Sequence, residues 1–124
     1  MTYHDAYIGD LDDFDWECAD GNNTNTPARL GPYFPPVGGY HDEPFWRIRE
    51  LIESGKLTGK QTDWGAWTAK ANKEQILAFI EDCYRGQYTN PSEMPHLYKQ
   101  FEELMVFAKC LYDGKLYALV ATEF

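Results

Sequence analysis

The chain has 124 residues, of which 44% are hydrophobic and 16% aromatic, and its formal net charge is −9. This composition excludes a disordered polar chain, and the length suffices for one hydrophobic core, so we expect a single globular domain over residues 1–124. No apolar run approaches the roughly 20 residues of a membrane-spanning helix. The N-terminus has no basic region followed by an apolar run, so we expect no signal peptide. The three cysteines are widely spaced and odd in number, which favours a reduced, cytoplasmic protein without disulfides.

The negative charge is concentrated at the N-terminal end. Residues 1–28 contain seven acidic residues and no lysine or arginine, which leaves a charge of only −2 for the rest of the chain. Because contacts to phosphates need lysine and arginine, we expect no direct binding of nucleic acid.

Two strands are expected before residue 19. Tyr3–Ile8 is a short candidate strand that ends before Gly9. Residues 13–18 alternate acidic and apolar side chains, in the order Asp13, Phe14, Asp15, Trp16, Glu17 and Cys18. A two-residue period predicts a half-buried strand, here with one apolar face and a ladder of carboxylates on the other.

A long loop is predicted at residues 19–41, where proline, glycine and aromatic residues alternate without a period. A connection of this length is uncommon in a compact domain and is often functional. Its aromatic side chains either cover the core or contact a partner. In the second case the apolar anchors are Tyr33, Phe34 and Tyr40.

Asp42 and Pro44 mark the start of a helix that ends at Gly55. Its buried face is predicted to consist of Phe45, Ile48, Leu51 and Ile52. On its outer face, ion pairs with i,i+4 spacing are expected for Glu43–Arg47 and Arg49–Glu53. Residues 56–61 are expected to form a polar link.

The best-defined stretch runs from Thr62 to Arg85. Asp63–Ala69 is predicted to be a strand, and Asn72 opens a helix in which Gln75 completes a capping box. Gly86 is placed to end this helix in a left-handed conformation. Glu81 and Arg85 are spaced for an ion pair. The apolar stripe of the helix consists of Ile76, Leu77, Ile80, Cys83 and Tyr84.

A third helix is predicted from Pro95, and Leu116–Val120 follows as a central strand buried on both faces. The apolar positions of the helix recur every three or four residues at Leu97, Phe101, Leu104, Ala108 and Leu111. A hairpin of Val106–Tyr112 and Lys115–Ala121 around Asp113-Gly114 is the alternative. We favour the helix because its spacing continues through Leu111.

These elements predict an α+β fold. Their order is strand, strand, long loop, helix, strand, helix, helix, strand, without the regular alternation of a parallel α/β sheet. We expect a small, mostly antiparallel sheet of about four strands with three helices packed on one face.

Metal and cofactor sites are not predicted. Residues 13–24 match a calcium-binding EF-hand loop at its first, third and fifth positions. Cys18 and Thr24 stand where that loop needs glycine and a bidentate glutamate. Neither the histidines (His4, His41 and His96) nor the cysteines recur at the short spacings of zinc sites.

Catalysis is less favoured than binding. Cys18, Cys83 and Cys110 all fall on predicted apolar faces, so we expect them to be buried packing residues. His4 and His41 could form a general base with a carboxylate, but their spacing does not require it. No catalytic residue is assigned.

In composition, the chain resembles small accessory proteins of bacteria and their phages, including immunity proteins that neutralise toxins and phage inhibitors of host defence. This resemblance implies a non-catalytic acidic protein that masks a basic surface of a protein partner. The acidic residues that would steer the partner are Asp10, Asp12, Asp13, Asp15 and Glu17. The alternative is a small enzyme or ligand-binding domain whose pocket is closed by residues 19–41, with His4 and His41 as titrating groups.

Overall fold

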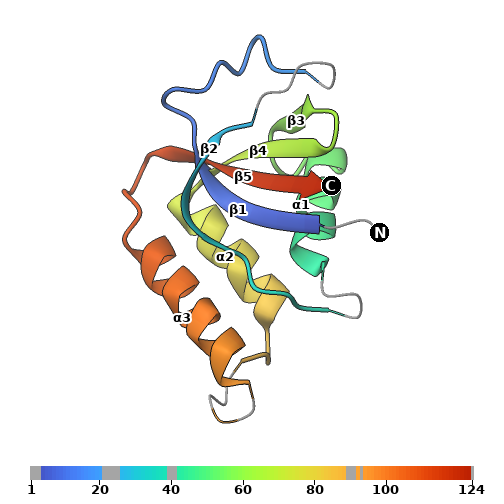
Figure 1. Cartoon of the computed structure of the whole chain (residues 1–124). Helices are drawn as coiled ribbons and strands as arrows, with labels where there is room; N and C mark the ends of the chain where they lie inside the picture. The colour runs from blue at the N-terminus through green and yellow to red at the C-terminus, as the bar shows by residue number, and fades with distance from the viewer. Residues whose placement is uncertain (1–3, 21–25, 39–41, 89–91, 93, 124) are drawn as a thin grey trace.

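The computed structural model describes residues 4–20, 26–38, 42–88, 92 and 94–123. Within them the elements follow the order β1, β2, α1, β3, β4, α2, α3, β5 (Figure 1). The strands are β1 His4–Asp10, β2 Ala28–Tyr33, β3 Gly59–Asp63, β4 Ala66–Asn72 and β5 Leu116–Glu123. The helices are α1 Glu43–Glu53, α2 Lys73–Tyr84 and α3 Pro95–Lys109.

The strands form one antiparallel sheet in the order β2-β1-β5-β4-β3. The last strand of the chain, β5, therefore lies in the middle, hydrogen-bonded to β1 on one side and to β4 on the other. Its residues 117–122 are all buried. The predicted central strand at Leu116–Val120 is thereby confirmed.

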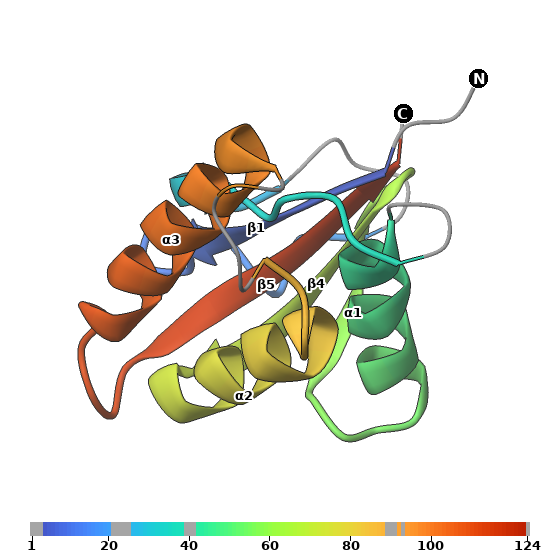
Figure 2. The same cartoon turned by 90° about the horizontal axis from the view of Figure 1, so that it is seen from below.

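All three helices cover the same face of the sheet (Figure 2). The main core lies between these layers and includes Ile8 and Leu119 from the sheet and Ile48, Ile80 and Leu104 from the helices. The predicted α+β arrangement is confirmed, with five strands rather than about four.

The central helix follows its sequence signals closely. Asn72 Oδ1 accepts a hydrogen bond from Gln75 N at 2.9 Å, and Gln75 Oε1 accepts one from Asn72 N at the same distance, which completes the predicted capping box. Gly86 has a φ of 75°, as expected for the residue that ends the helix. Arg85 forms an ion pair with Asp82 at 3.6 Å rather than with Glu81.

The other two helices also agree with the sequence analysis. In α1 both predicted ion pairs form, with N–O distances of 2.6 Å for Arg47–Glu43 and 3.1 Å for Arg49–Glu53. Helix α3 extends to Lys109, so the alternative hairpin of residues 106–121 does not form. No helix in the described part of the chain combines the length and the apolar character needed to cross a membrane.

Two strands lie where the sequence predicted none. Strand β2 falls inside the predicted loop of residues 19–41, and β3 begins inside the predicted polar link. Both are edge strands of the sheet and only one of their residues is buried, so they carry little hydrophobic alternation. Pro32 in β2 is consistent with this position, because a proline, which has no amide hydrogen to donate, is accommodated in an edge strand.

The predicted strand Asp63–Ala69 is confirmed for Ala66–Ala69, which begin β4, whereas Asp63 ends β3 and the two residues between them form the tip of the β3–β4 hairpin. Trp64 and Gly65 form the turn, and Glu123 N donates a hydrogen bond to Gly65 O at 2.7 Å. A Cβ atom on Gly65 would lie 2.5 Å from Glu123 O, so only glycine permits this contact between the turn and the end of β5.

The predicted strand at residues 13–18 is wrong, because this segment forms turns. Aspartate side chains accept hydrogen bonds from nearby backbone amides, and these bonds compete with the backbone hydrogen bonds of a β-sheet. Asp10 Oδ1 accepts a hydrogen bond from Asp12 N at 2.9 Å, and Asp15 Oδ1 accepts one from Cys18 N at 3.2 Å. Cys18 is consequently exposed and not buried. Cys110, which follows the end of α3, is exposed as well, and only Cys83 is buried as predicted.

Candidate functional site

The acidic residues singled out from the sequence lie on the sheet face opposite the helices. We call residues 11–20 the acidic strap. After β1 the strap extends over the sheet on the side away from α2 and α3 (Figure 1). Leu11, at its start, packs against Tyr7, Ala118 and Val120, the small apolar cluster of this face.

Trp16 fastens the acidic strap to the sheet. Its ring lies 4.3 Å from Lys70 Nζ on β4 and 5.0 Å from Lys60 Nζ on β3. Lys60 also donates a hydrogen bond to the backbone oxygen of Trp16. Cation–π contacts of this kind stabilise a half-buried indole between two ammonium groups.

Lys115 holds the beginning of the acidic strap. Its Nζ donates a hydrogen bond to Asp12 Oδ2 at 2.8 Å, and this bond raises the pKa of Lys115. The carboxylate of Asp12 is therefore paired within the protein, although 61% of its side chain is exposed. Lys115 therefore neutralises part of the negative charge that the sequence predicted for a partner.

Asp15 stabilises the next turn of the strap. Hydrogen bonds from the thiol and the backbone amide of Cys18 lower the pKa of Asp15 and keep it ionised. The same contact raises the pKa of the Cys18 thiol. Asp13 and Glu17 are exposed, while Asp10 is half-buried at the end of β1. The five predicted acidic residues therefore lie close together in the chain, but residues 11–20 form turns and not the strand with a row of carboxylates that was predicted.

Three lysines, Lys60, Lys70 and Lys115, contact the acidic strap without any local signal in the sequence that predicts it. Lys60 contacts a residue 44 positions away, and Lys115 one 103 positions away. No local spacing signals such contacts. The acidic residues on both sides of Trp16 indicate that nearby basic residues would be favourable, but they do not indicate which ones.

Of the predicted apolar anchors, the two that the structure describes, Tyr33 and Phe34, do not share a surface. Tyr33 is 50% exposed, with the Arg29 guanidinium 4.6 Å above its ring. Phe34 is buried in the main core, where its ring lies 5.5 Å from that of Phe79, so its prediction as a partner contact is wrong. Successive residues of an extended chain point to opposite sides, which separates Tyr33 from Phe34. Tyr40 lies outside the described residues.

His4, one of the two histidines of the alternative hypothesis, lies between two carboxylates. His4 Nδ1 lies 2.9 Å from Asp42 Oδ2, and His4 Nε2 lies 3.5 Å from Glu123 Oε2. Both ring nitrogens therefore face carboxylates of the protein. His41 lies outside the described residues.

Asp42 has a different role from the predicted helix cap. It occupies the N-cap position of α1, but its side chain makes no capping hydrogen bond. Instead, Asp42 Oδ2 accepts a hydrogen bond from Trp46 Nε1 at 2.9 Å and contacts His4. Asp42 thereby connects the start of β1 with the first turn of α1.

Shallow clefts adjoin the segment of residues 26–38. One, of about 510 Å³, is lined by His4, Arg29 and Phe34 together with residues of α3. Another, of about 480 Å³ on the open sheet face, is lined by Tyr7, Tyr33, Trp64 and Thr122 among others. Among the described residues, no three His, Cys, Asp or Glu side chains are grouped as metal ligands.

Comparison of the chain with models of protein families, with curated proteins and with solved structures found no match.

Proposed function

We propose that this protein is a non-catalytic acidic binding protein that masks a basic surface of a protein partner, as immunity proteins and phage inhibitors of host defence do. The observation that supports this function is the attachment of the acidic strap. Trp16 and the lysines beneath it hold the segment in place, while Asp13 and Glu17 remain exposed.

A held segment is better suited to recognition than a free one. Ordering a loop upon binding costs conformational entropy, and a segment that is already ordered avoids most of this cost. Carboxylates fixed on one side of the protein also steer a basic partner and orient it during encounter. A lysine or arginine of the partner would compete with Lys115 for Asp12, which is largely exposed.

Charge reversal tests the proposed function. Asp13→Lys together with Glu17→Lys should remove binding of basic proteins from a lysate of the source organism, measured by quantitative mass spectrometry on the immobilised protein. Wild-type binding should decrease steeply as salt is raised, because screening weakens contacts between exposed charges.

The matched control is Glu81→Lys with Glu102→Lys, which changes the net charge equally at two exposed helix positions. This control should retain the same basic proteins as the wild type. Retention of the same proteins by the strap variant, or binding that does not respond to salt, would contradict the proposed function.

A further inference from the structure

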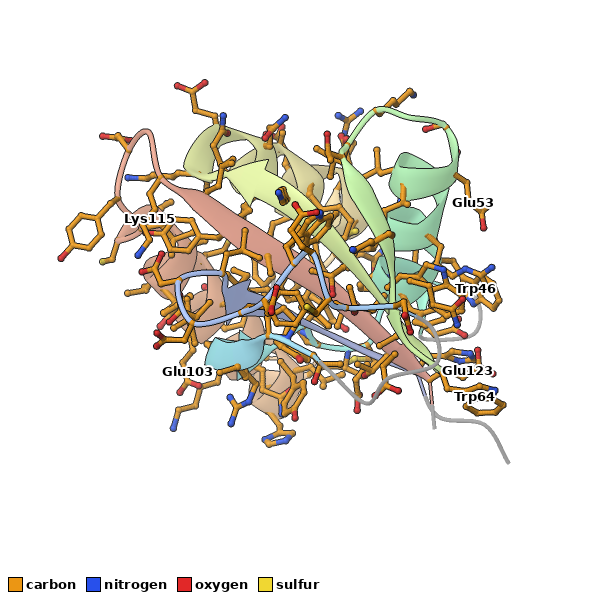
Figure 3. All side chains as sticks on the ribbon, turned by 90° about the horizontal axis from the view of Figure 1, so that it is seen from above. Trp46, Glu53, Trp64, Glu103, Lys115 and Glu123 are labelled. Atoms are coloured by element: carbon orange, nitrogen blue, oxygen red, sulfur yellow. The ribbon has the colours of Figure 1, made fainter. Side chains whose placement is uncertain are left out.

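Two exposed tryptophans lie at the same end of the molecule. Figure 3 shows Trp46 and Trp64 at this end, with Glu123 beside Trp64, whereas Lys115 lies at the other end. Trp46 is 48% exposed and Trp64 is 79% exposed. We call Trp46, Trp64, His4, Asp42 and Glu123 the tryptophan corner.

Trp64 is exposed although its backbone is firmly held. Its amide donates a hydrogen bond to Asp63 Oδ1 at 2.6 Å, and Gln61 Nε2 donates one to its carbonyl oxygen at 2.7 Å. The next residue, Gly65, is bonded to the end of β5. The turn therefore presents the Trp64 side chain to solvent from a backbone that is already ordered, so binding there avoids the cost of ordering the turn.

Trp46 is held in place through its side chain. Its Nε1 bonds to Asp42, and its ring packs edge-on against Phe45 with centroids 4.9 Å apart. The His4 ring lies 5.4 Å from it. Half of the indole remains exposed in spite of these contacts.

His4 and Glu123 connect the surroundings of the two tryptophans through a series of contacts. His4 contacts Trp46 through its ring and Glu123 through Nε2. Glu123 N is in turn bonded to Gly65, next to Trp64. The Glu123 side chain is 35% exposed, so its carboxylate is accessible beside the Trp64 turn.

The charges of the tryptophan corner favour a cationic ligand. Asp42 and Glu123 supply two carboxylates, and His4 lies between them. Arg49 of α1 pairs with Glu53 and lies 4.1 Å over the Trp67 ring and 5.4 Å over the Trp46 ring. The protein's own arginine therefore already contacts Trp46, and the ligand cation is assigned to Trp64. Indole rings attract cations through their negative faces, and a carboxylate next to an indole adds a counter-ion.

We propose that the tryptophan corner binds an arginine-bearing segment of the protein partner, with a guanidinium group stacked on Trp64 and paired with Glu123. Arginine fits this site better than lysine, because the planar guanidinium stacks on an aromatic face and donates paired hydrogen bonds to a carboxylate. This second contact rests on the proposed function for the basic character of the partner, but it uses none of the strap residues.

Indole signals in ¹⁵N–¹H NMR spectra provide the test. The probe is a twelve-residue peptide of alternating arginine and serine, compared with lysine–serine and glutamate–serine peptides of the same length. The arginine peptide should shift the indole signals of Trp64 and Trp46 saturably. The lysine peptide should bind more weakly, and the glutamate peptide should cause no shift.

Trp64→Ala should weaken binding of the arginine peptide by about tenfold or more, as expected for a central aromatic anchor. The control is Tyr112→Ala, which removes another exposed aromatic ring. Tyr112 lies shortly before the start of β5, whereas Glu123 is at its end, so this variant should bind like the wild type. Unchanged binding by Trp64→Ala, or equal binding of the arginine and glutamate peptides, would overturn the inference.

The strap variant separates the two proposals. If Asp13→Lys with Glu17→Lys loses the basic partner while Trp64→Ala keeps both partner and peptide, the inference fails and the proposed function holds. If the strap variant keeps the partner but Trp64→Ala loses both partner and peptide, the proposed function fails as stated above, while the arginine-binding role of the tryptophan corner is supported on its own.

Discussion

At the scale of single residues, the three thiols differ in their surroundings. Cys83 lies in the main core, where burial raises its pKa to about 12. Cys18 is exposed, and the adjacent Asp15 carboxylate raises its pKa. Cys110 is exposed after the end of α3. Because the thiolate is the reactive form, these environments set the order of reactivity.

We expect Cys110 to react first with a thiol-specific disulfide reagent at pH 8, Cys18 more slowly, and Cys83 only after unfolding. Absorbance of the released thiolate gives the rates, and single cysteine-to-serine variants assign each phase. The denatured protein should show all three thiols reacting quickly. Reaction of Cys83 in the native protein at the rate of Cys110 would disprove its enclosure.

At the scale of elements, α2 has the clearest link between sequence and packing. Ile76 and Ile80 are fully buried on one face, whereas Glu81 is exposed on the other. The capping box at Asn72 satisfies amides that the first turn leaves without helical partners. The helix is therefore specified both by its start signal and by its apolar stripe.

Replacement of Ile80 by alanine should lower the free energy of unfolding by about 2–5 kcal/mol, because it removes buried methyl groups and leaves a cavity. Glu81→Ala, one position further on, should change it by less than about 0.5 kcal/mol. Urea titrations followed by circular dichroism measure both values. Similar small effects of the two substitutions would show that Ile80 does not support the core.

At the scale of the whole molecule, the sheet is covered differently on its two faces. Three helices bury one face, and the acidic strap crosses the other without regular structure. Within the strap, Trp16 is the residue whose ring lies against Lys60 of β3 and Lys70 of β4. Its half-buried indole connects residues that the chain separates widely.

Trp16→Ala should lower the free energy of unfolding by roughly 1–3 kcal/mol, less than the roughly 3–5 kcal/mol expected for a fully buried tryptophan. It should also increase cleavage of the strap by a protease specific for acidic residues. Trp64→Ala is the matched control, since its indole is 79% exposed and its loss should barely change stability. If both variants behave alike, Trp16 does not fasten the strap.

The elements that could be predicted from the sequence are those in which the local signals agree with burial. The helices at Glu43–Glu53, Lys73–Tyr84 and Pro95–Lys109 each bury one apolar face, so their periodicity records their packing. The central strand β5 is buried on both faces, which produces a continuous apolar run. These features led to the correct α+β fold class.

The features that could not be predicted have weak local signals and depend on contacts with residues far away in the chain. The edge strands β2 and β3 form because β1 and β4 supply hydrogen bonds, not because their side chains alternate. The alternation at residues 13–18 did not make a strand, since aspartates bonded to local amides and Lys60, Lys70 and Lys115 held the segment from across the sheet. Likewise, His4 meets Asp42 and Glu123 only because β1, α1 and β5 converge. Contacts between residues so far apart in the chain leave no periodic trace in the sequence, because they depend on how the elements are arranged in space.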